Sequence, residues 1–443
     1  MRAAADVADV NETCGRNLRR QVRRKCVFQI LSVIALLASL PACRSASGFD
    51  ASFGAVVKPY RFNVLRWEGK ELFKRPARQA PGGAQSKAAD AAGTPMDEYM
   101  QLLDDIRGAE RTLASTSPGG AAPPTVPPDL QALQLRNTAL APQVERILGS
   151  QIRQALQTEG IFGPADRLGG LRIPFPPLYF RLQRPPHTLI VSPRERIESM
   201  REEMLLQDLS PDAVDQIERQ VEALGVSALV EEIGGFGATF PTFVSDDASL
   251  YWIIKTATEE WLHQYLAFTP LGFAYVLDLV GVARNYEIAT INETVAGLVS
   301  AEVAMSVMRA HYPDYLKPRL RRDASTQPRP VETPAAPGID FNRTMRETRM
   351  AVDDMLARGQ VVEAEHFMEE RRQYLAANGY YIRRLNQAYF AFYGSYADMP
   401  SSVSPIGEEL RRLRASSASL RGFLNAAAGI RTRGQLQALL ATR

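Results

Sequence analysis

Glu259-Glu260-Trp261-Leu262-His263 and, further along, Asn292-Glu293-Thr294-Val295-Ala296 are the two stretches of the sequence that decide its interpretation. Both lie in apolar segments that we expect to be helical. In a helix, positions i and i+4 project from one face about 6 Å apart, so Glu259 and His263 can both reach one metal ion. Glu260 lies one position round, where its carboxylate can hold a water molecule at that ion. Glu293, on the second helix, can supply a third ligand.

Histidine is scarce in this chain, which has four in 443 residues. The other three, His187, His311 and His366, lie in no comparable cluster. The carboxylates of the two stretches have many apolar neighbours, and a buried carboxylate needs a partner, which a metal ion would be. The alternative is structural: a solvated helix face that carries Glu259 and His263, and an Asn-Glu pair that caps a helix.

The two stretches resemble the active-site motifs of the gluzincin metallopeptidases, in which one helix carries His-Glu-x-x-His and a glutamate within Asn-Glu-x-x-Ala is the third ligand. The resemblance covers roughly residues 235–305. It implies a zincin-like core in which Glu260 is the general base and His263 and Glu293 bind zinc. A strand expected at 237–244 fits the family's edge strand, which pairs with an extended peptide substrate. The chain departs from the family at the first ligand, where Glu259 replaces a histidine.

That replacement changes the chemistry expected of the site. Two carboxylates and one imidazole are a harder and more negative ligand set than two imidazoles and one carboxylate, so we expect a weaker preference for zinc and acceptance of Mn²⁺ or Fe²⁺. An active site would hydrolyse peptide bonds, with Glu260 taking a proton from the attacking water and returning it to the leaving amine. The alternative is a non-catalytic envelope lipoprotein that uses a degenerate peptidase scaffold for binding or assembly.

Other chemistry receives less support. Three tyrosines in an aromatic stretch are candidate oxyanion donors, although core packing also explains them: Tyr389, Tyr393 and Tyr396. The spacing Glu260-x-x-His263 also occurs in di-iron helical bundles, but these need a second such motif. The only other match, Glu363 with His366, lies in a charged stretch typical of an exposed face. The sequence has no phosphate-binding loop, no Gly-x-Ser-x-Gly motif and no Cys-x-x-Cys pair.

The N-terminus reads as a targeting segment. A basic stretch precedes an apolar run at residues 27–42, which is shorter than the roughly 20 residues that cross a bilayer comfortably. The run ends in Leu40-Pro41-Ala42-Cys43, which resembles a bacterial lipobox, and no cysteine follows Cys43. We therefore expect lipidation of Cys43 and a membrane-anchored, extracytoplasmic protein of the cell envelope. An uncleaved helical anchor is the alternative.

The charge of the chain is concentrated in that leader. Residues 1–42 carry seven basic and three acidic side chains, whereas the whole chain has a net charge of only +3. The exported part is therefore close to neutral, and we expect no nucleic-acid partner. A peptide or protein substrate and a membrane are the expected partners.

Composition and periodicity predict an α+β fold that is predominantly helical, with a zincin-like core, a small sheet and a helical C-terminal part. The expected divisions are a signal peptide or anchor at 1–42, a tether with one helix at 43–128, the core domain at 129–317, a linker at 318–340 and a helical region at 341–443. Strands are expected at 171–182, 187–191 and 237–244.

Helix boundaries follow from caps and turns. Ser192-Pro193 and Ser210-Pro211 both read as helix starts, with the second helix running to about Ile233. The C-terminal region is expected to contain helices at 341–357, 361–377 and 380–393.

Overall fold

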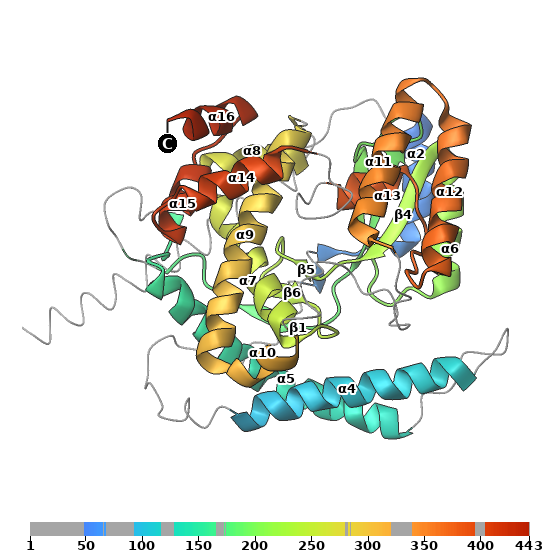
Figure 1. Cartoon of the computed structure of the whole chain (residues 1–443). Coiled ribbons are helices and arrows are strands. Elements are labelled where there is room, and N and C mark those ends of the chain that lie inside the picture. The colour runs from blue at the N-terminus through green and yellow to red at the C-terminus, as the bar shows by residue number, and fades with distance from the viewer. Residues whose placement is uncertain are drawn as a thin grey trace, which may run out of the picture. The chain divides into compact units, whose positions relative to one another are not determined.

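The fold is α+β and predominantly helical, as predicted (Figure 1). The computed structural model describes residues 48–64, 66–67, 93–116, 128–164, 172, 174–279, 282–283, 285–319, 339–394 and 404–442. Residues 52–443 belong to one compact unit, and of the preceding unit only 48–51 are described. The predicted leader, the lipidation site Cys43 and most of the predicted linkers lie outside the described residues, so these expectations and the domain boundaries stay predictions.

The helices follow the chain as α2 (Gly48–Val57), the 3₁₀ turn η1 (Lys58–Tyr60), α4 (Gly93–Thr116), α5 (Pro128–Thr158), α6 (Pro211–Glu222), α7 (Leu250–Leu266), α8 (Pro270–Leu279), α9 (Tyr286–His311), α10 (Pro313–Arg319), α11 (Phe341–Ala357), α12 (Val361–Ala377), α13 (Gln387–Tyr393), α14 (Ile406–Ala415), α15 (Leu420–Ala427) and α16 (Arg433–Ala441). The strands are β1 (Phe180–Leu182), β2 (His187–Pro193), β3 (Arg201–Leu205), β4 (Val226–Glu232), β5 (Gly235–Phe236) and β6 (Thr242–Val244).

One small sheet lies against α7 and has the order β1-β6-β5. β6 pairs in parallel with β1 and antiparallel with β5. The expectation of an edge strand at 237–244 is therefore wrong in two respects: the strand covers only Thr242–Val244, and it lies in the middle of the sheet. Its three residues are all buried, because both neighbours and α7 cover them. The edge beside α7 belongs to β5 instead.

A second sheet, with the order β3-β2-β4, corrects two predicted helices. Ser192-Pro193 does not start a helix, because both residues continue β2 and pair with Ser227 and Val226 of β4. Ser210 does cap α6, and its side chain accepts a hydrogen bond from the Ala213 N–H. That helix ends at Glu222 rather than near Ile233. Gly225 then adopts a positive φ of 86°, and the apolar run after it forms β4.

The helices α7 and α9 form the centre of the larger hydrophobic core (Figure 1). α9 runs from Tyr286 to His311 and contains the second of the two stretches that we expected to be helical; the Asn285 side chain caps it by accepting from the Ile288 N–H. The buried faces of the two helices are lined by aliphatic residues such as Ile253, Leu262, Val295 and Val299. Burial of these side chains fixes the rotation of each helix, and so decides which polar residues face one another.

The C-terminal region is helical, as expected, with one correction. α11 and α12 have the predicted limits and are separated by Gly359, whose φ of 76° suits the turn. The predicted helix at 380–393 is wrong in its first half: α13 begins only at Gln387, where the Asn386 side chain accepts a hydrogen bond from the Tyr389 N–H. These helices and the second sheet share a separate core cluster.

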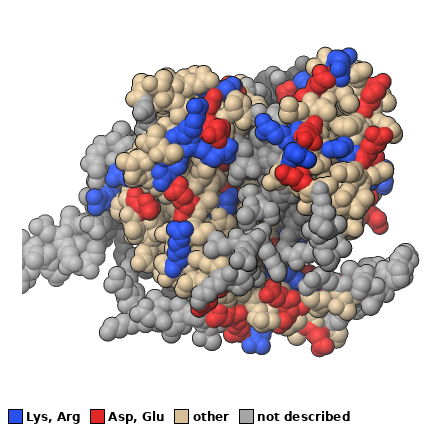
Figure 2. Space-filling view, viewed as in Figure 1, with Lys and Arg blue, Asp and Glu red and all other residues tan. Residues whose placement is uncertain are grey.

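Two surface observations complete the fold. No helix in the described ranges combines the length and the apolar character needed to cross a bilayer. Figure 2 shows acidic and basic side chains interspersed over the face that it draws.

Candidate metal centre

Glu259 and His263 on α7 and Glu293 on α9 converge, as the sequence predicts. Ligand atoms of these three side chains all lie within 4.8 Å of one another. His263 Nε2 is 3.5 Å from Glu293 Oε2. The convergence follows from the α7–α9 packing, because Glu259 and His263 are one turn apart on the face that meets α9. One imidazole nitrogen and two carboxylates at this separation fit a transition metal such as zinc.

The three side chains are largely but not wholly buried. Their exposed fractions are 14% for Glu259, 19% for His263 and 10% for Glu293. Such partial burial weakens screening by water, so the charges of the site interact more strongly than they would at the surface. Whether the three residues bind a metal stays a prediction.

A hydrogen bond to Asn292 orients the imidazole of His263. The Nδ1 atom lies 2.9 Å from Asn292 Oδ1, an acceptor, which selects the form with a proton on Nδ1. The opposite nitrogen, Nε2, then faces Glu293. Metal-binding histidines generally have such a partner on the second ring nitrogen. This role of Asn292 was not predicted, although its place next to Glu293 was a usable signal.

The carboxylates around His263 govern its protonation in the absence of a cation. Burial disfavours the charged imidazole, but Glu293, followed by Glu260 and Glu259, outweighs burial and raises the pKa of His263 to about 10. The pairing with His263 also changes the pKa of Glu293. Burial works against ionisation of Glu293, yet the pKa of Glu293 is lowered because His263 and the Tyr275 hydroxyl stabilise the carboxylate.

Tyr275 on α8 is the tyrosine that reaches the site. Its hydroxyl donates to Glu293 Oε1 at 2.5 Å, which leaves Oε2 for His263 or a cation. The tyrosines that the sequence suggested lie elsewhere: Tyr389 and Tyr393 are buried in the separate C-terminal core cluster, and Tyr396 is outside the described residues. Tyr275 was missed because no helical spacing connects α8 with Glu293.

Glu260 lies beside the three ligands, under the backbone of β5. The Gly237 N–H donates to its carboxylate. A Cβ atom at Gly235 would lie 2.5 Å from Glu260 Oε1, and one at Gly237 would lie 2.5 Å from Oε2, so a side chain at either position would displace the carboxylate. This glycine-rich segment, residues 234–237, therefore forms a close cover over the carboxylate.

In the absence of a cation, the surroundings of Glu260 bring its proton affinity into the range of a general base. Burial raises the pKa of Glu260 to about 7. The charge of His263 lowers the pKa of Glu260, whereas the negative charges of Glu259 and Glu293 raise it further. A carboxyl group that titrates near neutral pH can both accept and return a proton, which is what general acid–base catalysis requires.

The glycine-rich cover is itself held by α7. Gln264 Nε2 donates to the Gly237 carbonyl at 2.9 Å, to the Thr239 carbonyl at 3.2 Å and to Thr242 Oγ1 at 3.0 Å. These bonds connect the helix that carries Glu260 to the segment that covers it. These hydrogen bonds therefore hold the glycine-rich segment in place over the Glu260 carboxylate.

Glu259 has a charged partner on its own helix, which was not predicted. Lys255, one turn earlier on α7, donates from Nζ to Glu259 Oε2 at 2.9 Å. Its Nζ also lies 4.9 Å from the centre of the Trp252 ring. The i, i+4 spacing of lysine and glutamate was visible in the sequence.

The other histidines take no part in the site. His187 lies in β2, where Nδ1 is 2.9 Å from the Leu206 carbonyl. His366 is 76% exposed and lies 3.3 Å from Glu370, in agreement with an exposed charged face rather than a second metal motif. Within the described part of the chain, the three ligands above are the one group of this kind.

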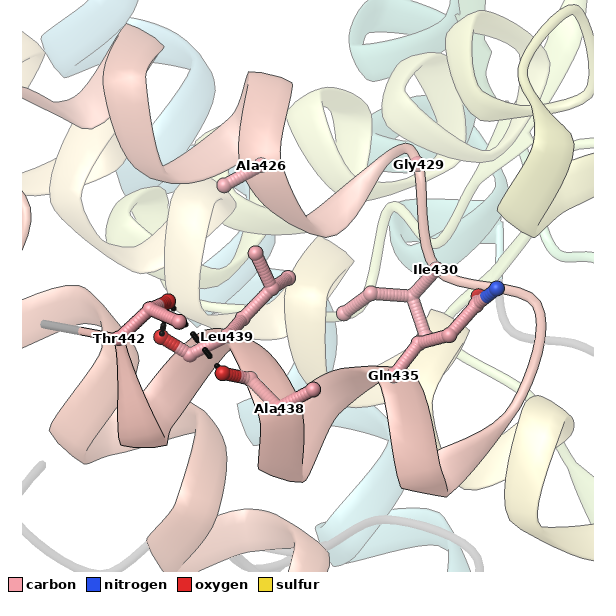
Figure 3. A pocket seen from close by; sticks show the side chains of 7 residues that line it. All are labelled: Ala426, Gly429, Ile430, Gln435, Ala438, Leu439 and Thr442. Carbon is pink, nitrogen blue, oxygen red and sulfur yellow. Dashed lines mark hydrogen bonds between the residues drawn. The ribbon is translucent and has the colours of Figure 1, made fainter.

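A separate groove lies between α15 and α16 and has a volume of about 380 Å³ (Figure 3). It is lined by Ala426, Gly429, Ile430, Gln435, Ala438, Leu439 and Thr442. None of the candidate ligands contributes to it. The groove is therefore distinct from the metal centre.

The chain matches no protein-family model, no curated protein and no solved structure.

Proposed function

We propose that this protein is a metal-dependent hydrolase of peptide bonds with a zincin-like core, tethered at the extracytoplasmic side of a membrane. The observation that carries the proposal is the convergence of Glu259, His263 and Glu293 within 4.8 Å of one another. Glu260 is next to them, and in the absence of a cation burial raises its pKa to about 7. The sequence of the leader, including Cys43, supports the membrane tether.

Each of these residues has a defined role in the proposed reaction. Glu259, His263 and Glu293 would hold zinc, or alternatively Mn²⁺ or Fe²⁺, which supplies Lewis-acid polarisation of the scissile carbonyl. Glu260 accepts a proton from the attacking water and returns it to the leaving nitrogen. Asn292 keeps Nε2 of His263 directed at the site, and Tyr275 keeps one oxygen of Glu293 engaged.

The position of β5 favours a peptide over other substrates. β5 lies at the edge of its sheet, and in the described residues no strand pairs with its outer side. Its backbone covers Glu260, so an extended chain added at this edge would pass the general base. This role replaces the one that the sequence suggested for residues 237–244.

Activity measurements test the proposal. The purified protein, loaded with Zn²⁺ or Mn²⁺ in parallel, is assayed against a mixture of unstructured peptides, with cleavage followed by mass spectrometry. We expect cleavage that Glu260→Gln reduces by about a thousandfold or more, within the range of losses seen when general acid–base groups are removed. Equal cleavage by wild type and Glu260→Gln would contradict the proposal.

The second candidate is a non-catalytic envelope protein that keeps the scaffold for binding or assembly. One observation favours it: the ammonium group of Lys255 already pairs with Glu259, so the site contains a cation of its own. A wild-type protein that is metal-free and inactive, yet folded and stable, would support this candidate.

A further inference from the structure

Lys255 is an unusual residue for the interior of a helix pair. It is only 7% exposed, and lysine is almost never buried without a partner. Its Nζ atom is 2.9 Å from Glu259 Oε2, and the side chain of Glu259 is itself 14% exposed. The Trp252 ring gives the ammonium group a second favourable contact, at 4.9 Å from the ring centre. This pair therefore lies in a site from which water is largely excluded.

Lys255 pairs with Glu259, which is the candidate ligand that stands where a two-histidine site has its first histidine. A carboxylate in place of a neutral imidazole adds one negative charge to the ligand set. The ammonium group of Lys255 cancels that added charge through a direct hydrogen bond. Lys255 and Glu259 together are therefore electrically equivalent to one neutral ligand.

The ion pair also restricts how Glu259 can bind. Lys255 engages Oε2, which leaves Oε1 as the free ligand atom. Tyr275 does the same for Glu293, where it engages Oε1 and leaves Oε2. Each carboxylate thus offers one oxygen. Hard cations such as Mn²⁺, Mg²⁺ and Ca²⁺ favour several charged oxygens, whereas zinc is satisfied by few ligands that include nitrogen.

We infer that Lys255 determines the metal preference of this site: by neutralising Glu259 and occupying one of its oxygens, it makes a Glu/His/Glu ligand set select Zn²⁺ over Mn²⁺. This inference rests on the proposed metal centre. It reverses the expectation, drawn from the ligands alone, that replacement of histidine by Glu259 weakens the preference for zinc.

The test is the ratio of the dissociation constants for Zn²⁺ and Mn²⁺, measured on the purified full chain by competition with chelators. We expect Lys255→Met to shift this ratio toward Mn²⁺ by about tenfold or more, because outer partners of metal ligands commonly change affinity by such factors. Lys255→Arg keeps the charge and should retain the wild-type ratio. Lys58→Met, which removes an exposed lysine in η1, is the matched control and should change nothing.

The same substitution made in a Glu259→His protein shows whether Lys255 acts through Glu259. It also keeps the inference testable if Lys255→Met alone does not fold. In Glu259→His, the ligand is neutral and needs no compensation, so adding Lys255→Met should leave the metal ratio of that variant unchanged. An unchanged ratio for Lys255→Met in the wild-type background, or an equal shift in the Glu259→His background, would overturn the inference.

The two proposals fail in different ways. If the wild-type protein binds neither Zn²⁺ nor Mn²⁺, the metal centre itself is refuted and the role of Lys255 falls with it. If the wild type binds zinc tightly but the ratio does not respond to Lys255→Met, the metal centre stands and only the role of Lys255 is refuted.

Discussion

Asn292 and His263 are joined by a hydrogen bond of 2.9 Å between Oδ1 and Nδ1, and the next residue on α9, Glu293, faces the opposite ring nitrogen at 3.5 Å. Two adjacent residues of one helix therefore hold both nitrogens of an imidazole on another. This arrangement fixes which nitrogen is presented to the site. Two further hydrogen bonds complete the site: Tyr275 donates to Glu293, and Lys255 donates to Glu259.

Replacement of Asn292 tests the orienting role. Asn292→Ala removes the acceptor for Nδ1, so His263 can rotate or change its protonated nitrogen, and zinc affinity should fall by about 10- to 100-fold. Competition with a chromophoric chelator measures the affinity. Asn292→Asp keeps an acceptor at the same place and should bind zinc at least as well as the alanine variant. Equal affinity of the wild type and Asn292→Ala would show that the bond has no orienting role.

Loss of the Tyr275 hydroxyl should affect the site more than the fold. Tyr275→Phe frees Glu293 Oε1, and we expect zinc affinity to fall by about tenfold while the free energy of unfolding changes by only about 1 kcal/mol. Tyr381→Phe removes the hydroxyl of a tyrosine that is 55% exposed and serves as the control. Denaturant titration and metal competition on both variants make the comparison. A large loss of stability without a change in affinity would assign Tyr275 a structural role alone.

The neighbouring glycines Gly234 and Gly235 offer a matched pair of substitutions. A Cβ at Gly235 would lie 2.6 Å from Thr256 Cγ2 and overlap the Glu260 carboxylate, whereas the nearest atom to a Cβ at Gly234 is 3.8 Å away. We expect Gly235→Ala to lose about 1 to 3 kcal/mol of stability through overpacking and to displace Glu260, with loss of hydrolysis. Gly234→Ala should be close to wild type. Similar behaviour of the two variants would contradict the close cover over Glu260.

Glu231 provides a test by pH away from the metal centre. Burial raises the pKa of Glu231 from 4.5 to about 7, despite the opposing effects of Arg383 and of a hydrogen bond from Tyr393. The folded state thus binds this proton more tightly than the unfolded state, and its contribution to stability is lost as the pH rises through this window. Glu231→Gln has no proton to lose. The variant should therefore gain stability relative to the wild type between pH 5 and pH 8, by about 1 kcal/mol or more.

Unfolding by urea at pH 5, 6, 7 and 8 measures this difference. Glu369→Gln is the control, because the hydrogen bond from Arg372 lowers the pKa of Glu369 to about 2. This carboxylate is ionised in both the folded and the unfolded state over most of pH 5 to 8, so the difference between wild type and Glu369→Gln should stay nearly constant across this range. A difference between wild type and Glu231→Gln that is constant across this range would show that Glu231 ionises normally in the folded protein.

The sequence predicted the two helices of the site well, because periodic apolar residues on α7 and α9 require burial and one turn of helix separates Glu259 from His263. It failed where the outcome depends on tertiary contacts. β4 follows α6 without a polar break, and only the positive φ of Gly225 separates them. Tyr275 reaches Glu293 from another helix, a contact that no local pattern encodes. The spacing between Lys255 and Glu259 could be read from the sequence. The burial of Lys255, which makes the pair significant, could not.

The most direct test of the metal centre is the metal content of the purified protein, measured by inductively coupled plasma mass spectrometry. After zinc loading and removal of excess metal, the wild type and His366→Ala, which alters an exposed histidine, should each retain one equivalent. His263→Ala should retain none. A wild-type protein without bound metal, or a His263→Ala variant with the same content as the wild type, would contradict the proposal that Glu259, His263 and Glu293 surround a common cation.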